Sequence, residues 1–173
     1  MGIEIERKFL VGDESWRGDV AKSIEIQQGY LELKENFSIR LRIIDRAEAN
    51  ITIKSAWRDR RRDEFEYPIP VPDAERMLAW RTGSIIEKTR HLVPTGDLTW
   101  EIDVFSGDNA GLVIAEVELQ HEEQTVALPS WAGAEVTSDQ RYHNATLALR
   151  PFKDWTAADT PADFDRTALK ESV

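Results

Sequence analysis

The chain contains no cysteine among its 173 residues. Disulfides and thiolate chemistry are therefore excluded, and a cytoplasmic location is the default for such a chain. No run of the sequence approaches the roughly 20 apolar residues that a membrane-spanning helix needs. The N-terminus also lacks an apolar signal core, because Glu4, Glu6 and Lys8 interrupt it at once. We therefore expect a cytoplasmic protein without a membrane partner.

Positive charge is also in short supply, since 22 lysine and arginine residues face 32 acidic ones and the net charge is −10. This balance argues against binding nucleic acid or anionic lipid through bulk charge, although it is compatible with a local basic pocket. No glycine-rich phosphate loop is present. The length fits one domain with a substantial core. We predict a single domain over residues 1–150 and a polar C-terminal tail over residues 151–173.

Strand-like segments dominate the first two thirds of the chain. They combine β-branched or aromatic residues with alternation of period 2, and turn residues separate most of them. The predicted strands cover Ile3–Val11, Ile24–Leu33, Ser38–Asp45, Asn50–Ser55, Glu64–Ile69, Ile85–Val93, Leu98–Phe105 and Leu112–Leu119. Eight short strands in a row predict a mostly antiparallel sheet that forms either a barrel or a sandwich.

Three helices are predicted between and after these strands. The segment 72–83 has Asp73 as a plausible N-cap and Gly83 as a stop signal. A short second helix is expected over Glu122–Ala127, and a packed third helix over residues 137–149. The polar, aspartate-containing sequence after this helix predicts a loosely docked tail.

Charged residues recur two positions apart in several predicted strands, so that both side chains point to one face. The first strand mixes signs, and each later strand with two such charges keeps a single sign. The acidic members are Glu4, Glu6, Glu64, Glu66, Glu101, Asp103, Glu116 and Glu118, and the basic members are Lys8, Arg40, Arg42, Lys54, Lys88 and Arg90. One such pair is typical of a solvated strand face. The whole set indicates an inner surface, because adjacent like charges repel unless bound ions balance them.

The chemistry of this set predicts the class of ligand. Arginine forks match phosphate oxygens, and lysine acts beside them as a point charge. Clustered carboxylates suit a hard divalent cation such as Mg²⁺ or Mn²⁺. A polyphosphate bridged by metal satisfies both requirements. If the charged faces point inward, the interior of the barrel is polar and binds this ligand.

The ordered motifs resemble the CYTH superfamily, the triphosphate tunnel metalloenzymes. The similar segments are EIERKFLV, QQGYL, SIRLRI, ITIKS, DEFEYPI, IIEKTRH, WEIDVF, AEVEL and DQRYHNATLA, in order from about Ile3 to Leu149. The resemblance implies an α+β, mostly β fold: a closed eight-stranded antiparallel β-barrel, or triphosphate tunnel, with a few peripheral helices. It also implies metal-dependent hydrolysis of a triphosphate, and the short bacterial inorganic triphosphatases are the most similar members.

Several alternatives remain open. A thiamine or nucleoside triphosphatase and a class IV adenylyl cyclase are the other enzymes that the resemblance allows, and a polyphosphate-binding module is the non-enzymatic alternative. The expected partner is a small-molecule triphosphate, and a homodimer is left open. The expected cofactor is Mg²⁺ or Mn²⁺.

We assign roles to the charged set on the strength of the resemblance and of residue chemistry. The phosphate-binding residues are Lys8, Arg40, Arg42, Lys54, Lys88 and Arg90. The metal ligands are Glu4, Glu6, Asp103, Glu116 and Glu118. The secondary candidates are Glu64, Glu66, Glu101 and Arg141. The catalytic candidates are Lys54, which would assist the leaving phosphate, together with Glu4, Glu6 and Tyr30.

Overall fold

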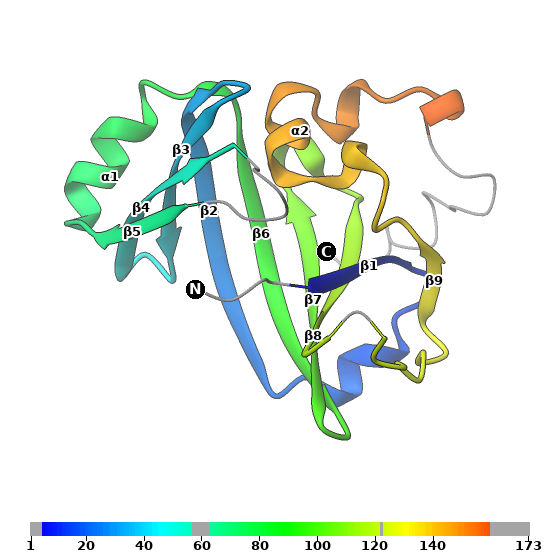
Figure 1. The fold of residues 1–173 in the computed structure, drawn as a ribbon. Coiled ribbons are helices and arrows are strands. Elements are labelled where there is room, and N and C mark those ends of the chain that lie inside the picture. The colour runs from blue at the N-terminus through cyan, green and yellow to red at the C-terminus, as the bar shows by residue number, and fades with distance from the viewer. Residues whose placement is uncertain (1–4, 57–62, 122, 160–173) are drawn as a thin grey trace.

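The computed structural model describes residues 5–56, 63–121 and 123–159, which form a mostly β fold with few helices (Figure 1). The strands are β1 Ile5–Val11, β2 Lys22–Leu33, β3 Phe37–Ile44, β4 Glu48–Ser55, β5 Glu64–Pro68, β6 Thr82–Thr95, β7 Leu98–Ser106, β8 Val113–Leu119 and β9 Ala132–Glu135. The α-helices are α1 Val71–Leu78 and α2 Asn144–Leu149, accompanied by short 3-10 turns. None of the helices in these ranges is long and apolar enough to cross a bilayer.

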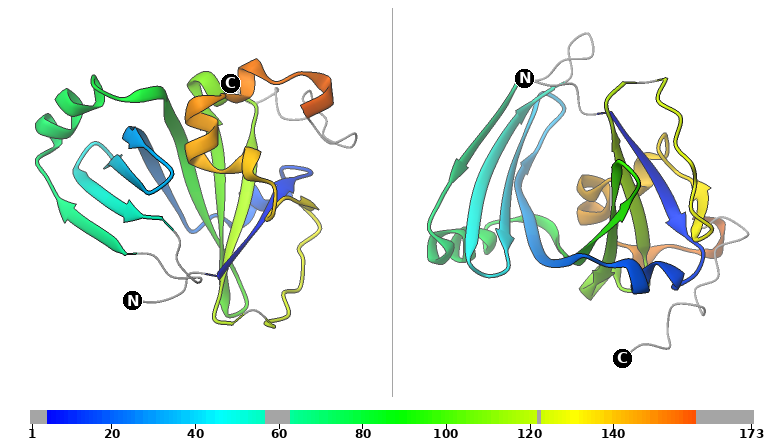
Figure 2. Two further views of the ribbon diagram at one scale, coloured as in Figure 1. Left: turned by 45° about the horizontal axis from the view of Figure 1, so that its top comes forward. Right: turned by 90° about the horizontal axis from the view of Figure 1, so that it is seen from below.

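All nine strands belong to one antiparallel sheet with the order β5-β4-β3-β2-β6-β7-β8-β1-β9. The sheet is strongly curved, so that its β5 and β1 ends turn toward one another (Figure 2). We call the side of the sheet that carries Lys8, Arg42 and Lys88 the inner face, and the opposite side the outer face. Alternation along each strand sends neighbouring residues to different faces.

The prediction of a closed eight-stranded barrel is wrong for this structure. Within the described ranges, β5 pairs with β4 alone, and the sheet is open between its two ends. The reason lies at the other end, where β1 pairs with β8 along one edge and with β9 along the other. Strand β9, with the sequence AGAE, lacks the β-branched and aromatic residues that signal a strand, and it was not predicted. It pairs with β1 at Phe9 and Val11 and so occupies part of the edge that closure would have needed.

Two apolar clusters cover the outer face. The larger one packs Phe9, Trp100 and Trp131 behind β1, β7 and β8, with the rings of Trp100 and Trp131 edge to face at 5.1 Å. The smaller one packs α1 onto β3 and β4 through Leu41 and Leu78. The apolar residues of each strand are buried in these clusters on the outer face. The alternate residues of the same strands therefore lie on the inner face.

A third apolar cluster lies on the inner face, beneath α2. It joins Tyr30 and Ile86 of the sheet to Leu147 of α2. Phe152 and Trp155 also pack into it. The chain directly after α2 is therefore docked, whereas the sequence predicted a loosely docked tail. One end of the inner face is therefore covered by apolar side chains.

The helix predictions need correction at their ends. Helix α1 begins at Val71 after an N-cap at Pro70, so Asp73 lies in the first turn and not at the cap. Gly83 belongs to β6 with φ 75°, where an added Cβ would lie 2.3 Å from the carbonyl oxygen of Ala148. The third helix is divided at His143 into a 3-10 turn and α2. Residues 123–127 are not helical.

Candidate functional site on the inner face

The basic side chains of the inner face are largely withdrawn from solvent. The side chain of Lys88 is 0% exposed, that of Lys8 is 8% exposed and that of Arg40 is 12% exposed. A solvated strand face would leave such side chains exposed, because lysine and arginine are almost never fully buried unless they are paired. The sequence prediction that these residues face inward is therefore confirmed by their burial, whereas their assigned roles stay predictions.

Asp103 of β7 is the centre of the most buried ion-pair network. Its carboxylate accepts a hydrogen bond from Lys88 Nζ, and two more at 2.7 Å from Nε and Nη2 of Arg90. Burial opposes the charge of this carboxylate, but the attraction of Lys88 and Arg90 outweighs burial and lowers the pKa of Asp103 to about 2. Asp103 is therefore an anion whose two oxygens are already engaged by cations.

Strands β1 and β8 extend the same network. Lys8 Nζ lies 2.8 Å from Glu6 Oε1 and 2.6 Å from Glu116 Oε1. Arg90 Nη2 lies 3.0 Å from Glu116 Oε2, and Arg90 also contacts Glu101. Although burial opposes the charge of Lys8, these carboxylates raise its pKa. Acidic and basic residues predicted for separate metal and phosphate roles thus neutralise one another here.

A second group of ion pairs lies on β3, β4 and β5. Lys54 Nζ is 2.9 Å from Glu64 Oε2, and Arg40 Nη2 is 3.6 Å from Glu66 Oε2. Thr52 connects the latter pair, because its hydroxyl accepts from Arg40 Nη2 at 3.1 Å and donates to Glu66 Oε2 at 2.8 Å. The Nε atom of Arg40 is buried without a hydrogen-bond partner among the described residues. This N–H is a donor that an anion on the inner face would satisfy.

Two buried polar residues of the inner face were not among the predicted site residues. Thr52 and Gln28 are both fully buried. Gln28 Oε1 accepts a hydrogen bond from Arg42 Nε at 3.1 Å. The signal that could have found them is their position, since each lies two residues before an inner-face residue, Lys54 and Tyr30 respectively. Both side chains are neutral, whereas the predicted site residues, Tyr30 excepted, are charged.

Two predicted residues, Tyr30 and Arg141, lie apart from the charged network. Tyr30 is buried in the apolar cluster beneath α2, where its hydroxyl accepts from Gln28 Nε2 at 3.4 Å. Arg141 donates from Nε to Asp139 Oδ1 at 2.9 Å and from Nη1 to the carbonyl oxygen of Asp159 at 2.6 Å, and none of these groups belongs to the network. Glu4 lies outside the described residues.

The comparisons with known proteins agree with this geometry. The family model described as the CYTH domain matches residues 2–150. The chain belongs to the CYTH family. An inorganic triphosphatase from Acetivibrio thermocellus is 38% identical over 156 residues, which are 90% of this chain and 99% of the relative. An inorganic triphosphatase from Nitrosomonas europaea is 38% identical over 151 residues, which are 84% of this chain and 97% of the relative.

A solved structure of an inorganic triphosphatase supports the same assignment. It is 37% identical to this CYTH chain, with a TM-score of 0.69, and the alignment covers 86% of this chain and 96% of the other. Both the fold and the sequence of this chain therefore match proteins of this kind over most of their length.

The predicted metal ligands fit a divalent cation only in part. In the described part of this CYTH chain, no three acidic or histidine side chains are placed to share one metal ion. Glu6 and Glu118 are direct cross-strand partners, and Glu116 follows on the same face of β8. Their carboxylate oxygens are the donors that Mg²⁺ and Mn²⁺ prefer. Asp103 fits less well, because it is fully buried and its oxygens are bound by Lys88 and Arg90. The oxygens of Glu116 are also engaged, by Lys8 and Arg90, so Glu116 must be released from them before it can bind a metal.

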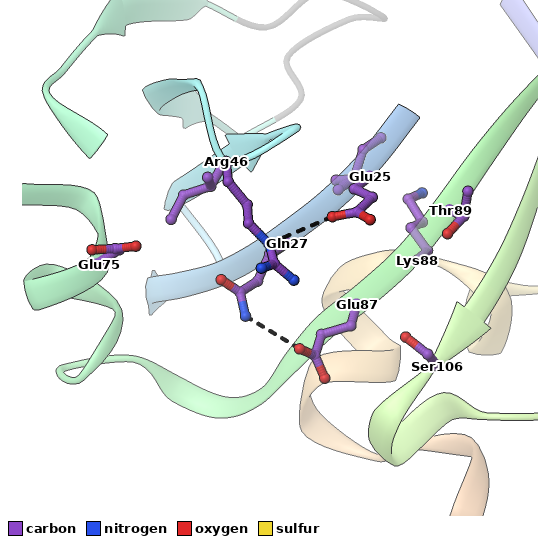
Figure 3. A pocket seen from close by; sticks show the side chains of 10 residues that line it. Glu25, Gln27, Arg46, Glu75, Glu87, Lys88, Thr89 and Ser106 are labelled. Atoms are coloured by element: carbon purple, nitrogen blue, oxygen red, sulfur yellow. Dashed lines mark hydrogen bonds and ion pairs between the residues drawn. The ribbon is translucent and has the colours of Figure 1, made fainter. Parts of the chain in front are cut away.

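A pocket of about 470 Å³ is lined by residues of β2, β6 and α1, and Lys88 of the charged network is among them (Figure 3). Its side chains include Glu25, Gln27, Glu87 and Thr89, which alternate along β2 and β6 with the inner-face residues. Glu75 of α1 closes one side. The pocket is therefore lined mostly from the outer face, and it reaches the charged network only at Lys88 among the residues that line it.

Proposed function

We propose that this chain is an inorganic triphosphatase that hydrolyses triphosphate to diphosphate and phosphate. The observation that carries the proposal is that basic side chains from four strands, β1, β3, β4 and β6, lie on one face and are largely withdrawn from solvent. Buried cations at this density need anions, and a polyphosphate supplies several in a row. The two inorganic triphosphatases at 38% identity support the choice of substrate.

The chemistry that these residues support is attack of water on a terminal phosphorus. The bond between that phosphorus and the bridging oxygen breaks, and diphosphate leaves with the bridging oxygen. Arg40, Arg42 and Lys88 would stabilise the negative charge of the phosphate oxygens as the bond breaks. Lys54 would offset the charge that develops on the leaving group. Each of these cations except Arg42 must first exchange a carboxylate for a phosphate.

A divalent cation fits the donor chemistry of Glu6, Glu116 and Glu118, and Glu4 is a further candidate beyond the described residues. When bound there, the cation would neutralise phosphate charge and orient the attacking water. We infer that phosphate binding and metal binding assist each other, because a phosphate that takes Lys8 releases Glu6 and Glu116. Mg²⁺ and Mn²⁺ both suit these ligands, and a cytoplasmic location remains our prediction.

Phosphate release measures this function directly. Triphosphate, thiamine triphosphate and ATP would be supplied in turn with Mg²⁺ or Mn²⁺, and cyclic AMP would be followed with ATP. We expect turnover to be fastest with triphosphate. Tight binding without turnover under either metal would instead support a polyphosphate-binding module.

The variant Glu6→Gln tests the acidic residues of the inner face. It keeps the shape of the side chain but removes a metal-binding charge, so we expect metal-dependent turnover to fall at least about tenfold, equivalent to roughly 1.4 kcal/mol. Glu25→Gln is the matched control, because Glu25 is exposed on the outer face of β2. Equal turnover by the two variants would contradict the assignment of Glu6.

A further inference from the structure

Gln28 is a fully buried amide within a row of charges. It lies in the middle of β2, directly opposite Arg42 in the pairing of β2 with β3. Its Oε1 accepts from Arg42 Nε at 3.1 Å, and its Nε2 donates to the Tyr30 hydroxyl at 3.4 Å. Both ends of the amide are thus engaged, which fixes the orientation of its oxygen toward the guanidinium.

Arg42 differs from the other inner-face cations in its charge balance. Lys8, Arg40, Lys54, Lys88 and Arg90 each lie within 4 Å of at least one carboxylate. Among the described residues, Arg42 has no such partner, and its side-chain contact is the neutral Gln28 amide. Burial and repulsion from Arg40 and Arg90 lower the pKa of Arg42 to about 10, which still leaves it charged at neutral pH.

We propose that Gln28 is a positioning residue, which orients Arg42 through a neutral amide and so leaves one buried positive charge uncompensated for the anionic substrate. This inference rests on the proposed function, since the anion is the triphosphate of the same inner face. The other cations must give up a carboxylate before they bind phosphate. Arg42 needs no such exchange, so its guanidinium is prepared for the substrate before the substrate arrives.

The substitution Gln28→Glu isolates this role. It preserves length and the acceptor for Arg42 Nε, but it supplies the carboxylate that Arg42 lacks. We expect the dissociation constant for inorganic triphosphate, measured by calorimetry with EDTA present, to rise about tenfold or more, which is the range of one hydrogen bond to a charged group. In turnover with Mg²⁺, KM should rise by a larger factor than kcat falls.

Thermal unfolding without ligand gives a second readout that a merely structural glutamine would not produce. The new carboxylate compensates a buried cation, so Gln28→Glu should melt at or above the wild-type temperature while it binds triphosphate more weakly. Gln27→Glu is the matched control. It adds the same charge at the neighbouring position of β2, on the outer face, and should leave triphosphate binding unchanged.

The outcomes separate this inference from the proposed function. Triphosphate binding by Gln28→Glu equal to wild type would overturn the inference, as would a ligand-free melting temperature well below wild type or a failure to fold. Wild-type protein that binds triphosphate without hydrolysing it would overturn the proposed function but leave the inference to be decided by the binding comparison. Wild-type protein that does not bind triphosphate would overturn both.

Discussion

Asp103 is the residue that holds two cations of the inner face in place. It is fully buried and accepts hydrogen bonds from both basic residues that β6 contributes, Lys88 and Arg90. Lys88 is tolerated at this depth because Asp103 pairs with it, and Arg90 shares Asp103 with Lys88 while also contacting Glu101 and Glu116. Asp103 was predicted as a metal ligand, and its contacts favour the different role of holding two phosphate-binding cations in place.

Replacement of Asp103 by asparagine should destabilise the protein without enlarging any cavity. The change removes the ion-pair partner of the buried Lys88, whereas Arg90 keeps Glu116 and Glu101, and the loss of a buried partner costs about 3–5 kcal/mol. Urea unfolding at neutral pH measures the loss. Asp97→Asn, in the exposed turn between β6 and β7, is the control and should be nearly neutral. An equal effect of both substitutions would contradict the role of Asp103.

The same residue predicts a pH dependence. The pKa of Asp103 is about 2 in the folded protein, whereas that of an unperturbed aspartate is 3.8. The folded state therefore favours the carboxylate. Its contribution to stability is fully present above about pH 4 and is lost as pH falls from there toward 2. The difference in unfolding free energy between wild type and Asp103→Asn should therefore shrink by about 2 kcal/mol across this window. A difference that stays constant with pH would contradict the ion-pair network.

At the scale of elements, the strands were predictable and their closure was not. The alternation that identifies β1 to β8 depends on each strand's own residues, such as Arg40 and Arg42 opposite Leu41. Strand β9 forms because Val136 and Gly12 place their backbone groups in reach of Lys8 and Trp131, which no local pattern reveals. Buried charge could likewise be predicted from repeated like-charged pairs, whereas the pairing of acids with bases depends on register between strands.

Gly83 gives a prediction for the contact between β6 and α2. Alanine at this position must adopt φ 75° and also place its Cβ against the carbonyl oxygen of Ala148. Gly96 has a similar φ of 61°, but an added Cβ there would meet open space. Gly96→Ala is therefore a matched control for the cost of the positive φ alone. We expect Gly96→Ala to lose about 1 kcal/mol and Gly83→Ala clearly more, because α2 must move. Equal losses in chemical denaturation would show that the close approach does not matter.

The whole molecule combines a net charge of −10 with an inner face whose cations are buried, as Lys8 and Lys88 are, or partly buried. Repulsion acts across this face, since Arg40 and Arg90 both lower the pKa of Arg42. A bound polyanion removes that repulsion. The stability of the folded state should therefore depend on the ligand more strongly than on salt in general.

Triphosphate should raise the melting temperature even when EDTA removes divalent metal. At 100 times its dissociation constant, a ligand specific for the folded state adds about 2.7 kcal/mol. The measurement compares triphosphate with sodium chloride of equal ionic strength in a thermal melt. An identical shift from both would indicate screening alone and would contradict binding at the inner face.

The open sheet has a mechanical consequence. The cluster beneath α1 stiffens β3 and β4, the other two clusters stiffen β1 and β6 to β8, and β2 is the strand that joins these two parts of the sheet. The sheet thus consists of two rigid parts that are joined through β2. Arg42 belongs to one part and Arg90 to the other, so a phosphate chain bound by both would restrict their relative motion. The sheet should then open less often when triphosphate is bound, and amide hydrogen exchange in β4 and β5 should slow.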